Sequence, residues 1–310
     1  MPTSLGGLPV LEIIVLSLLL LSLAFSLGFA LNRGSTCAVI AITELIQERK
    51  PARFVAFFEC TLWGALTYAA WQMTSGPQAH WSALAYTATG GVIFGVGAFV
   101  NGACAFGSVG HLGNGDTQFG FTFLGMYAVS TVASLANLLP AVMTSSMSLQ
   151  VAAPVTLSML VGFALLRFVI QRNNVTAYLK MTCAMLTTGV AYATIVLLKP
   201  GWSIALSHAQ SLPLASIAIT VAMFAGSVGS RWLERGRTRI KWPSLRGALR
   251  RLVGGTLMGS GAVLIPGGND TLLLVGLPIG AQEAALAYLL FAISVAVLVR
   301  TIGSPAQAWS

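Results

Sequence analysis

Two glycine-rich stretches decide the fold of this chain: Gly90-Gly91-Val92-Ile93-Phe94-Gly95-Val96-Gly97 and Gly254-Gly255-Thr256-Leu257-Met258-Gly259-Ser260-Gly261. The copies align without a gap, with every glycine of one on a glycine of the other. Each runs into an interruption, at residues 101–104 and 266–270. A helix interrupted at membrane depth frees backbone groups that lipid cannot satisfy, so such breaks are buried in protein or line a cavity. Paired breaks in corresponding positions are typical of transporter binding sites. The sequence therefore predicts a permease of two related halves, about residues 1–150 and 151–310.

The composition indicates a membrane protein. The 310-residue chain is 56% hydrophobic and only 8% charged, whereas soluble proteins contain about a quarter charged residues. Several apolar runs approach the ~20 residues that span a bilayer; they cover residues 9–31, 54–73, 154–170, 181–198 and 212–228. We expect an all-α, polytopic helical membrane protein that forms a single integral domain over residues 1–310.

The net charge of +9 is concentrated in three segments. Cytoplasmic loops of membrane proteins carry an excess of Lys and Arg, so the basic loops 48–53, 167–180 and 231–251 are predicted to be cytoplasmic. Residues 74–82, 140–153 and 201–212 contain no Lys or Arg and are expected on the outer side. Membrane topology accounts for the basic charge without a nucleic-acid partner, and the 231–251 loop is expected to contact anionic membrane lipid.

The order of apolar segments predicts broken helices. Residues 8–31 lack a basic n-region and a cleavage site, so they are expected to be a retained helix rather than a signal peptide. Residues 35–47, with Ser35 or Thr36 as N-cap, would rise only about 20 Å and are predicted to be a half-helix. A crossing helix is expected over 54–73, a break at 101–102, a short piece over 270–277 and a final helix over 281–302. The two glycine stretches are expected to enter the membrane from opposite faces. This is typical of inverted-topology repeats with broken or re-entrant half-helices.

The four cysteines predict neither a metal site nor a disulfide framework. Cys37, Cys60, Cys104 and Cys183 all lie in or beside apolar segments, and none forms a CxxC pair or a zinc spacing. No cofactor is expected. In apolar surroundings a thiol stays a neutral S–H donor rather than a reactive thiolate.

Three motifs resemble signatures of the YeeE/YedE family of sulfur-compound transporters. They are residues 28–37 (GFALNRGSTC), residues 90–107 (GGVIFGVGAFVNGACAFG) and the glycines of residues 254–268. The resemblance implies a bacterial inner-membrane, multi-pass permease of inverted halves that takes up thiosulfate along a path of cysteine thiols. It also implies a small TusA-like sulfur carrier as a partner. The family pattern places a third cysteine in the last motif, where this chain has Gly268.

The candidate substrate path combines the motif residues with the ends of the breaks. Half-helix N-termini offer unpaired N–H groups and a positive dipole end to an anion. Arg33 could bind the anion or lie at the membrane interface, and Asn101 and Asn269 could contact substrate or cap backbone. For Asp270 a capping role is favoured over transport. The predicted path consists of Cys37, Cys104, Arg33, Thr36, Asn101, Gly102, Ala103, Gly267, Gly268, Asn269 and Asp270.

Other polar residues are expected to be structural. Glu44 and Glu59 are predicted to pair with Arg49 or Arg53 of the neighbouring basic loop. Cys60 and Cys183 match no motif and are predicted to be packing residues, and most of the matched glycines are expected to serve tight helix packing.

Three hypotheses for function follow. The first is uptake of thiosulfate or a related small sulfur anion by a protein that is not an enzyme; the chain has no nucleotide-binding motif, so a gradient or downstream consumption would drive the flux. The second is a non-transporting scaffold or sensor for a TusA-like carrier, bound at residues 231–251. The third is an intramembrane thiol oxidoreductase that cycles Cys37 and Cys104 through a disulfide, although the usual CxxC pair is absent.

Overall fold

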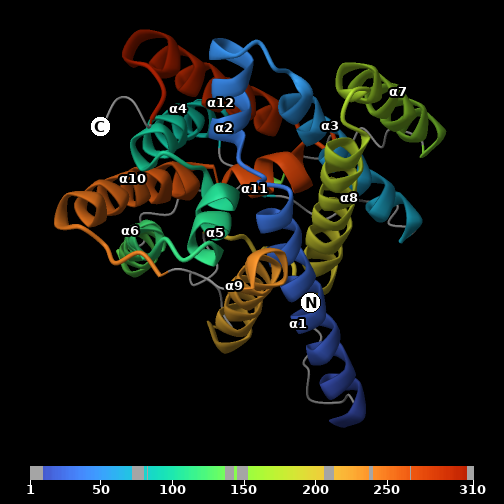
Figure 1. Cartoon of the computed structure of the whole chain (residues 1–310). Coiled ribbons are helices and arrows are strands. Elements are labelled where there is room, and N and C mark those ends of the chain that lie inside the picture. The colour runs from blue at the N-terminus through green and yellow to red at the C-terminus, as the bar shows by residue number, and fades with distance from the viewer. Residues whose placement is uncertain are drawn as a thin grey trace.

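The computed structural model describes residues 10–71, 80–81, 83–136, 143–144, 153–205, 213–236, 240–265 and 267–305. Helices dominate these residues (Figure 1). The elements of the first half are α1 Val10–Arg33, α2 Ala38–Gln47, α3 Ala52–Ala70, β1 His80–Trp81, α4 Leu84–Asn101, α5 Ala105–Gly113, the 3₁₀ turn η2 Thr117–Phe119, α6 Gly120–Leu135 and β2 Met143–Thr144. Those of the second half are α7 Ala153–Gln171, α8 Val175–Leu198, α9 Pro213–Arg235, α10 Leu245–Leu264, α11 Asn269–Thr271, the π-helical turn η3 Leu272–Gly276 and α12 Gln282–Ile302.

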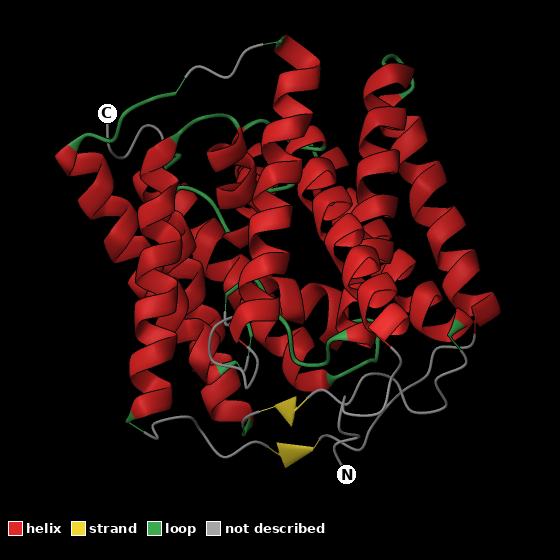
Figure 2. Ribbon diagram, turned by 90° about the horizontal axis from the view of Figure 1, so that it is seen from below, coloured by secondary structure: helices red, strands yellow, loops and turns green. Residues whose placement is uncertain are grey.

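The structure confirms an all-α polytopic membrane protein. Six segments of the described chain are long and apolar enough to cross a membrane, and the long helices run between two faces of the molecule (Figure 2). Large apolar side chains are exposed along outer helices; on α7, Leu165 is 59% and Val169 65% exposed. Such an apolar surface suits lipid rather than water.

Contacts between loops separate the two faces as the charges predict. On one face β1 pairs antiparallel with β2, which joins the two loops 74–82 and 140–153 that lack Lys and Arg. On the other face Glu234 accepts a hydrogen bond from Lys180 at 2.8 Å and lies 3.6 Å from Arg33. Glu234 thus joins the basic segments 167–180 and 231–251 to each other.

The bounds of two predicted basic loops are wrong. Of residues 231–251, only 236–244 lie between helices, because α9 continues to Arg235 and α10 begins at Leu245. Residues 167–180 are not a loop, because α7 continues to Gln171 and α8 begins at Val175. Arg167 therefore lies within α7, where it is fully buried. The sequence alone does not show that an arginine near a helix end has a partner inside the protein.

The two glycine stretches pack directly against each other. A Cβ on Gly90 of α4 would lie 2.8 Å from the carbonyl oxygen of Gly261 of α10, and one on Gly97 would lie 2.9 Å from that of Gly254. Only glycine permits such close backbone approach. Gly90 aligns with Gly254 and Gly97 with Gly261, so the contacts are reciprocal, as between two copies related by a local two-fold axis. The predicted packing role is confirmed, and Figure 1 shows α4 and α10 side by side.

The remaining glycines of each copy face a second helix. Gly91 and Gly95 of α4 lie against α12, where added Cβ atoms would meet Ala287 and Phe291. Their counterparts Gly255 and Gly259 of α10 lie against Thr122 and Met126 of α6. In both copies the contacted residues are one helical turn apart. Each glycine helix thus packs between its matched copy and one further helix.

Candidate functional site

The two motif cysteines begin two short helices. Cys37 is the N-cap of α2 and Cys104 the N-cap of α5, both with extended backbone. The break before Cys37 contains Ser35 at a positive φ of 48°, and the break before Cys104 begins at Gly102, whose left-handed φ of 79° ends α4. The expected cap at Ser35 or Thr36 is therefore wrong by one or two residues, because the turn continues to Cys37.

The breaks bring the two thiols into contact. The sulfur of Cys104 lies 3.8 Å from that of Cys37, and it accepts a hydrogen bond of 3.3 Å from the backbone N–H of Ala38. Cys37 is 1% and Cys104 0% exposed, and both are free thiols. Gly107 makes room for them, since a Cβ there would lie 2.5 Å from the sulfur of Cys37. The N-termini of α2 and α5 thus converge on one sulfur pair.

The third break approaches the same region. Gly267 adopts a positive φ of 147°, and Gly268 is the extended N-cap of α11. α11 packs against α5 near the centre of the molecule (Figure 1). A Cβ on Gly268 would collide with Oδ1 of Asp270 and would lie 3.0 Å from Cβ of Ala205. Gly268 therefore occupies the helix-cap position that Cys37 and Cys104 occupy in the other breaks, but without space for a side chain.

Asp270 does not cap a helix, contrary to the favoured interpretation of the sequence. Its Oδ2 accepts hydrogen bonds from the hydroxyl of Tyr192 at 2.9 Å and from the backbone N–H of Ile204 at 2.7 Å. Both donors come from distant parts of the chain, which the sequence pattern cannot show. The side chain is fully buried, and Oδ1 has no hydrogen-bond partner among the described residues.

The two asparagines at the breaks have different surroundings. Nδ2 of Asn101 donates to the carbonyl oxygen of Ala103 at 2.7 Å and to Oγ of Ser108 at 2.9 Å. Its Oδ1 accepts from the Thr122 hydroxyl, so Asn101 is a structural residue that ties the break together. Asn269 is also fully buried, yet neither atom of its amide has a partner within the described chain. The two asparagines therefore differ, since the described residues satisfy the amide of Asn101 and not that of Asn269.

The first break is held by a neighbouring arginine. Arg53 donates to the carbonyl oxygen of Ser35 at 2.7 Å and to Glu44 at 2.9 Å, which confirms the expected Glu44 pair. Arg33 is 35% exposed and paired with Glu234, which places it at the interface rather than beside the thiols. Thr36 is 1% exposed, and its hydroxyl is unpartnered in the part of the chain that the structure describes.

Sequence reasoning missed two aromatic residues near the third break. Tyr192 of α8 holds Asp270, and its ring packs on Trp202 with centroids 5.5 Å apart. Trp202 is 1% exposed, and its Nε1 has no partner among the described residues. Buried Tyr and Trp normally find a hydrogen-bond partner. The sequence could have indicated both residues, because Tyr192 lies within an apolar segment and Trp202 just after one, and each side chain needs a hydrogen-bond partner.

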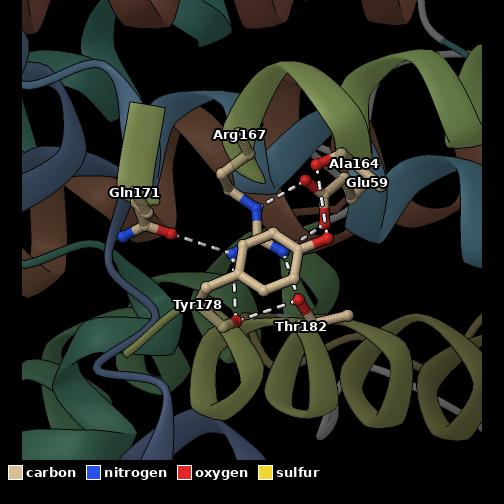
Figure 3. Close-up of polar contacts among 6 residues, drawn as sticks. All are labelled: Glu59, Ala164, Arg167, Gln171, Tyr178 and Thr182. Atoms are coloured by element: carbon tan, nitrogen blue, oxygen red, sulfur yellow. Dashed lines mark hydrogen bonds and ion pairs between the residues drawn. The ribbon is translucent and has the colours of Figure 1, made fainter. Parts of the chain in front are cut away.

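The expected partner of Glu59 is wrong. Glu59 of α3 accepts from Nε of Arg167 at 2.5 Å and from Nη2 at 2.7 Å, and both side chains are buried (Figure 3). The pair connects α3 to α7, whereas Arg53 of the basic loop pairs with Glu44. Of the remaining cysteines, Cys60 is buried as predicted, whereas Cys183 is exposed on the surface of α8.

Comparison with known proteins identifies the family of the chain. No curated protein matches the chain. The sulphur transport family matches residues 33–191, about half of the chain. The matched residues include both breaks that carry thiols, and the second glycine stretch lies beyond them. The chain belongs to the sulphur transport (YeeE/YedE) family of membrane proteins.

Proposed function

We propose that the protein takes up thiosulfate or a closely related small sulfur anion across the bacterial inner membrane. Membership of the sulphur transport family supports transport of a sulfur compound in general. The single observation that carries the narrower proposal is the contact of two buried thiols, 3.8 Å apart, at the N-termini of two short helices.

The chemistry of this arrangement suits a sulfur anion. The N-terminal turn of a helix presents backbone N–H groups and a partial positive charge to an anion. Here α2 and α5 direct two such ends toward the same sulfur pair. A thiol is a soft and weak hydrogen-bond donor, so it can contact the terminal sulfur of thiosulfate without holding it tightly. Weak contacts of this kind let the anion leave the thiols again, which favours its transport over tight binding.

The reciprocal packing of α4 and α10 supports the two-halves architecture. Copies that meet across a two-fold axis in the membrane plane have opposite topology and place their breaks at similar depth. In this proposal, residues 1–150 and 151–310 form the inverted halves, and the breaks at Cys104 and Gly268 are counterparts. The path then comprises Cys37, Cys104, Thr36, Gly267, Gly268, Asn269 and Asp270, while Asn101, Gly102 and Ala103 shape the break.

The cysteines of the chain provide matched variants for the test. Uptake of ³⁵S-labelled thiosulfate would be measured in bacteria that lack other importers and express Cys37→Ala or Cys104→Ala. The controls are Cys60→Ala, a second buried thiol, and Cys183→Ala, an exposed one. We expect uptake to fall at least tenfold in the first two variants and to change less than twofold in the controls. Equal uptake by all four at equal membrane expression would refute a thiol-lined path.

The short sulfur–sulfur distance also favours one alternative, a thiol oxidoreductase that cycles a Cys37–Cys104 disulfide. A disulfide needs the sulfurs about 2 Å apart, so small movements of α2 and α5 would suffice. Trapping free thiols in membranes, followed by mass spectrometry, separates the two functions. A disulfide that forms and disappears during turnover would support the enzyme, whereas two thiols that stay reduced during uptake would support transport.

The proposed partner on the cytoplasmic side is a TusA-like sulfur carrier. The basic residues of that face offer a surface to an acidic protein. Transport by the purified chain in proteoliposomes, with no carrier present, would exclude the scaffold function. Carrier binding without any flux would support it instead.

A further inference from the structure

The third break carries a buried carboxylate, Asp270, two residues after Gly268. Asp270 is 0% exposed, and none of the ion pairs among the described residues includes it. A buried carboxylate that lacks a cationic partner is disfavoured in its ionised form, although the two hydrogen bonds to Oδ2 offset part of this cost, so the site favours uptake of a proton or a cation. At membrane depth an unpaired acid of this kind is commonly part of a transport mechanism.

The geometry links this carboxylate to the missing cysteine. Oδ1 of Asp270 lies against the backbone of Gly268, and any Cβ at that position would collide with it. The break therefore accommodates either a side chain at residue 268 or the inward carboxylate of Asp270, but not both in this conformation. The aspartate fills the space that a third thiol would need.

One oxygen of the Asp270 carboxylate and the side-chain amide of Asn269 have no hydrogen-bond partner among the described residues. Oδ2 is occupied by Tyr192 and the backbone of Ile204, whereas Oδ1 and both amide atoms of Asn269 have no hydrogen-bond partner within the described ranges. A buried carboxylate with one donor-bound and one free oxygen can hold a proton on the free oxygen. Oδ1 can then carry the O–H of the protonated acid, while Oδ2 keeps its two hydrogen bonds.

The titratable groups around Asp270 do not neutralise its charge. α8 contributes Tyr192, and Tyr68 of α3 lies near that hydroxyl. α5 contributes the thiol of Cys104 at its near end and His111 toward its far end. η3 and residues 202–205 contain no titratable side chain. α5, η3 and residues 202–205 contain no Lys or Arg, and Lys180 of α8 pairs with Glu234 instead.

We propose that Asp270 is the proton-binding site of a proton–anion symporter, which takes up one proton with each sulfur anion. This inference rests on the proposed function. α11 packs against α5, whose first residue follows Cys104, so an anion at the thiols places negative charge near Asp270. Nearby negative charge favours the protonated acid, and by linkage a protonated Asp270 favours the anion. The two ligands then bind together.

Purified protein in proteoliposomes tests the coupling. With the membrane potential clamped to zero and the outside one pH unit more acidic, wild-type protein should accumulate labelled thiosulfate about tenfold, because one unit of pH difference drives a tenfold ratio at one proton per anion. Asp270→Asn should not accumulate thiosulfate above the outside concentration. Asp116→Asn, which removes the only other aspartate of the chain, should accumulate it as the wild type does. Accumulation by Asp270→Asn, or accumulation driven by sodium alone, would overturn the proposal.

A second measurement keeps the proposal testable if Asp270→Asn fails to fold. In Asp116→Asn protein grown with ¹³C-labelled aspartate, any isotope-shifted carboxylic acid band in the infrared spectrum belongs to Asp270. We expect this band at neutral pH, with greater intensity after thiosulfate is added. Its absence in the presence of thiosulfate would overturn the proposal. Thiosulfate exchange without a pH gradient tests the proposed function separately, so the two failures are distinguishable.

Discussion

Replacing Glu59 by Gln should destabilise the protein strongly without changing the transport path. The variant keeps the size of the side chain but removes the charge that neutralises Arg167. The guanidinium is 0% exposed and also donates to Gln171, to the backbone of Tyr178 and to Thr182 (Figure 3). It is therefore fixed in place and cannot move to water when its partner is lost.

The expected magnitude follows from this burial. Removing one partner of a buried ion pair costs about 3–5 kcal/mol, because the other charge stays buried and unpaired. At about 2 °C per kcal/mol for a chain of this size, the Tm should fall by about 6–10 °C. Replacing both residues by apolar ones, Glu59→Leu with Arg167→Met, should restore most of the loss, because such exchanges are often neutral or stabilising.

The assay is thermal unfolding of the detergent-purified protein, followed by the loss of the monodisperse peak in size-exclusion chromatography. The wild type, Glu59→Leu, Arg167→Met and the double variant complete a thermodynamic cycle, and Glu59→Gln is measured beside them. Thiosulfate uptake per folded molecule should be the same in all of them. A Tm of Glu59→Gln within about 1 °C of the wild type would refute the reasoning, since it would mean that water reaches the guanidinium.

Three further perturbations test other parts of the structure. Gly97→Leu should destabilise the α4–α10 contact by about 3 kcal/mol, measured by the same thermal assay, whereas Gly162→Ala on an open surface should change stability by less than about 1 kcal/mol. A membrane-permeant thiol oxidant should block uptake by linking Cys37 to Cys104, with recovery on reduction; unchanged uptake with the disulfide present would contradict the proposed path. Arg53→Met should cost about 2 kcal/mol and lower uptake, because it removes the charged donor to the carbonyl of the first break; normal uptake would show that the break holds its shape unaided.

The positions of the breaks could be predicted from the sequence because glycine and apolar periodicity are local signals. The expected interruption at residues 101–102 agrees with the end of α4 at Asn101 and its C-cap Gly102. The expected helix over 281–302 agrees with α12, which begins one residue later. Small-residue packing was also foreseen, but not that each glycine stretch would contact its own copy.

Contacts between distant helices could not be predicted. Glu59 and Arg167 are 108 residues apart, and a nearby basic loop offered a plausible but wrong partner for the glutamate. Asn101 and Asn269 looked equivalent in the sequence, yet only Asn101 meets side chains that satisfy its amide. Asp270 was expected to cap a helix, because glycine followed by a polar residue is a strong local signal, whereas its partners come from α8 and residue 204.

The reciprocal glycine contact limits how the two stretches can diverge during evolution. A larger residue at Gly90 would collide with Gly261, and one at Gly97 would collide with Gly254. A larger side chain in one stretch would therefore require the backbone of the other stretch to move. Sequence drift is therefore expected to concentrate away from this contact. Mutual steric constraint accounts for the likeness of the two stretches, whatever their origin.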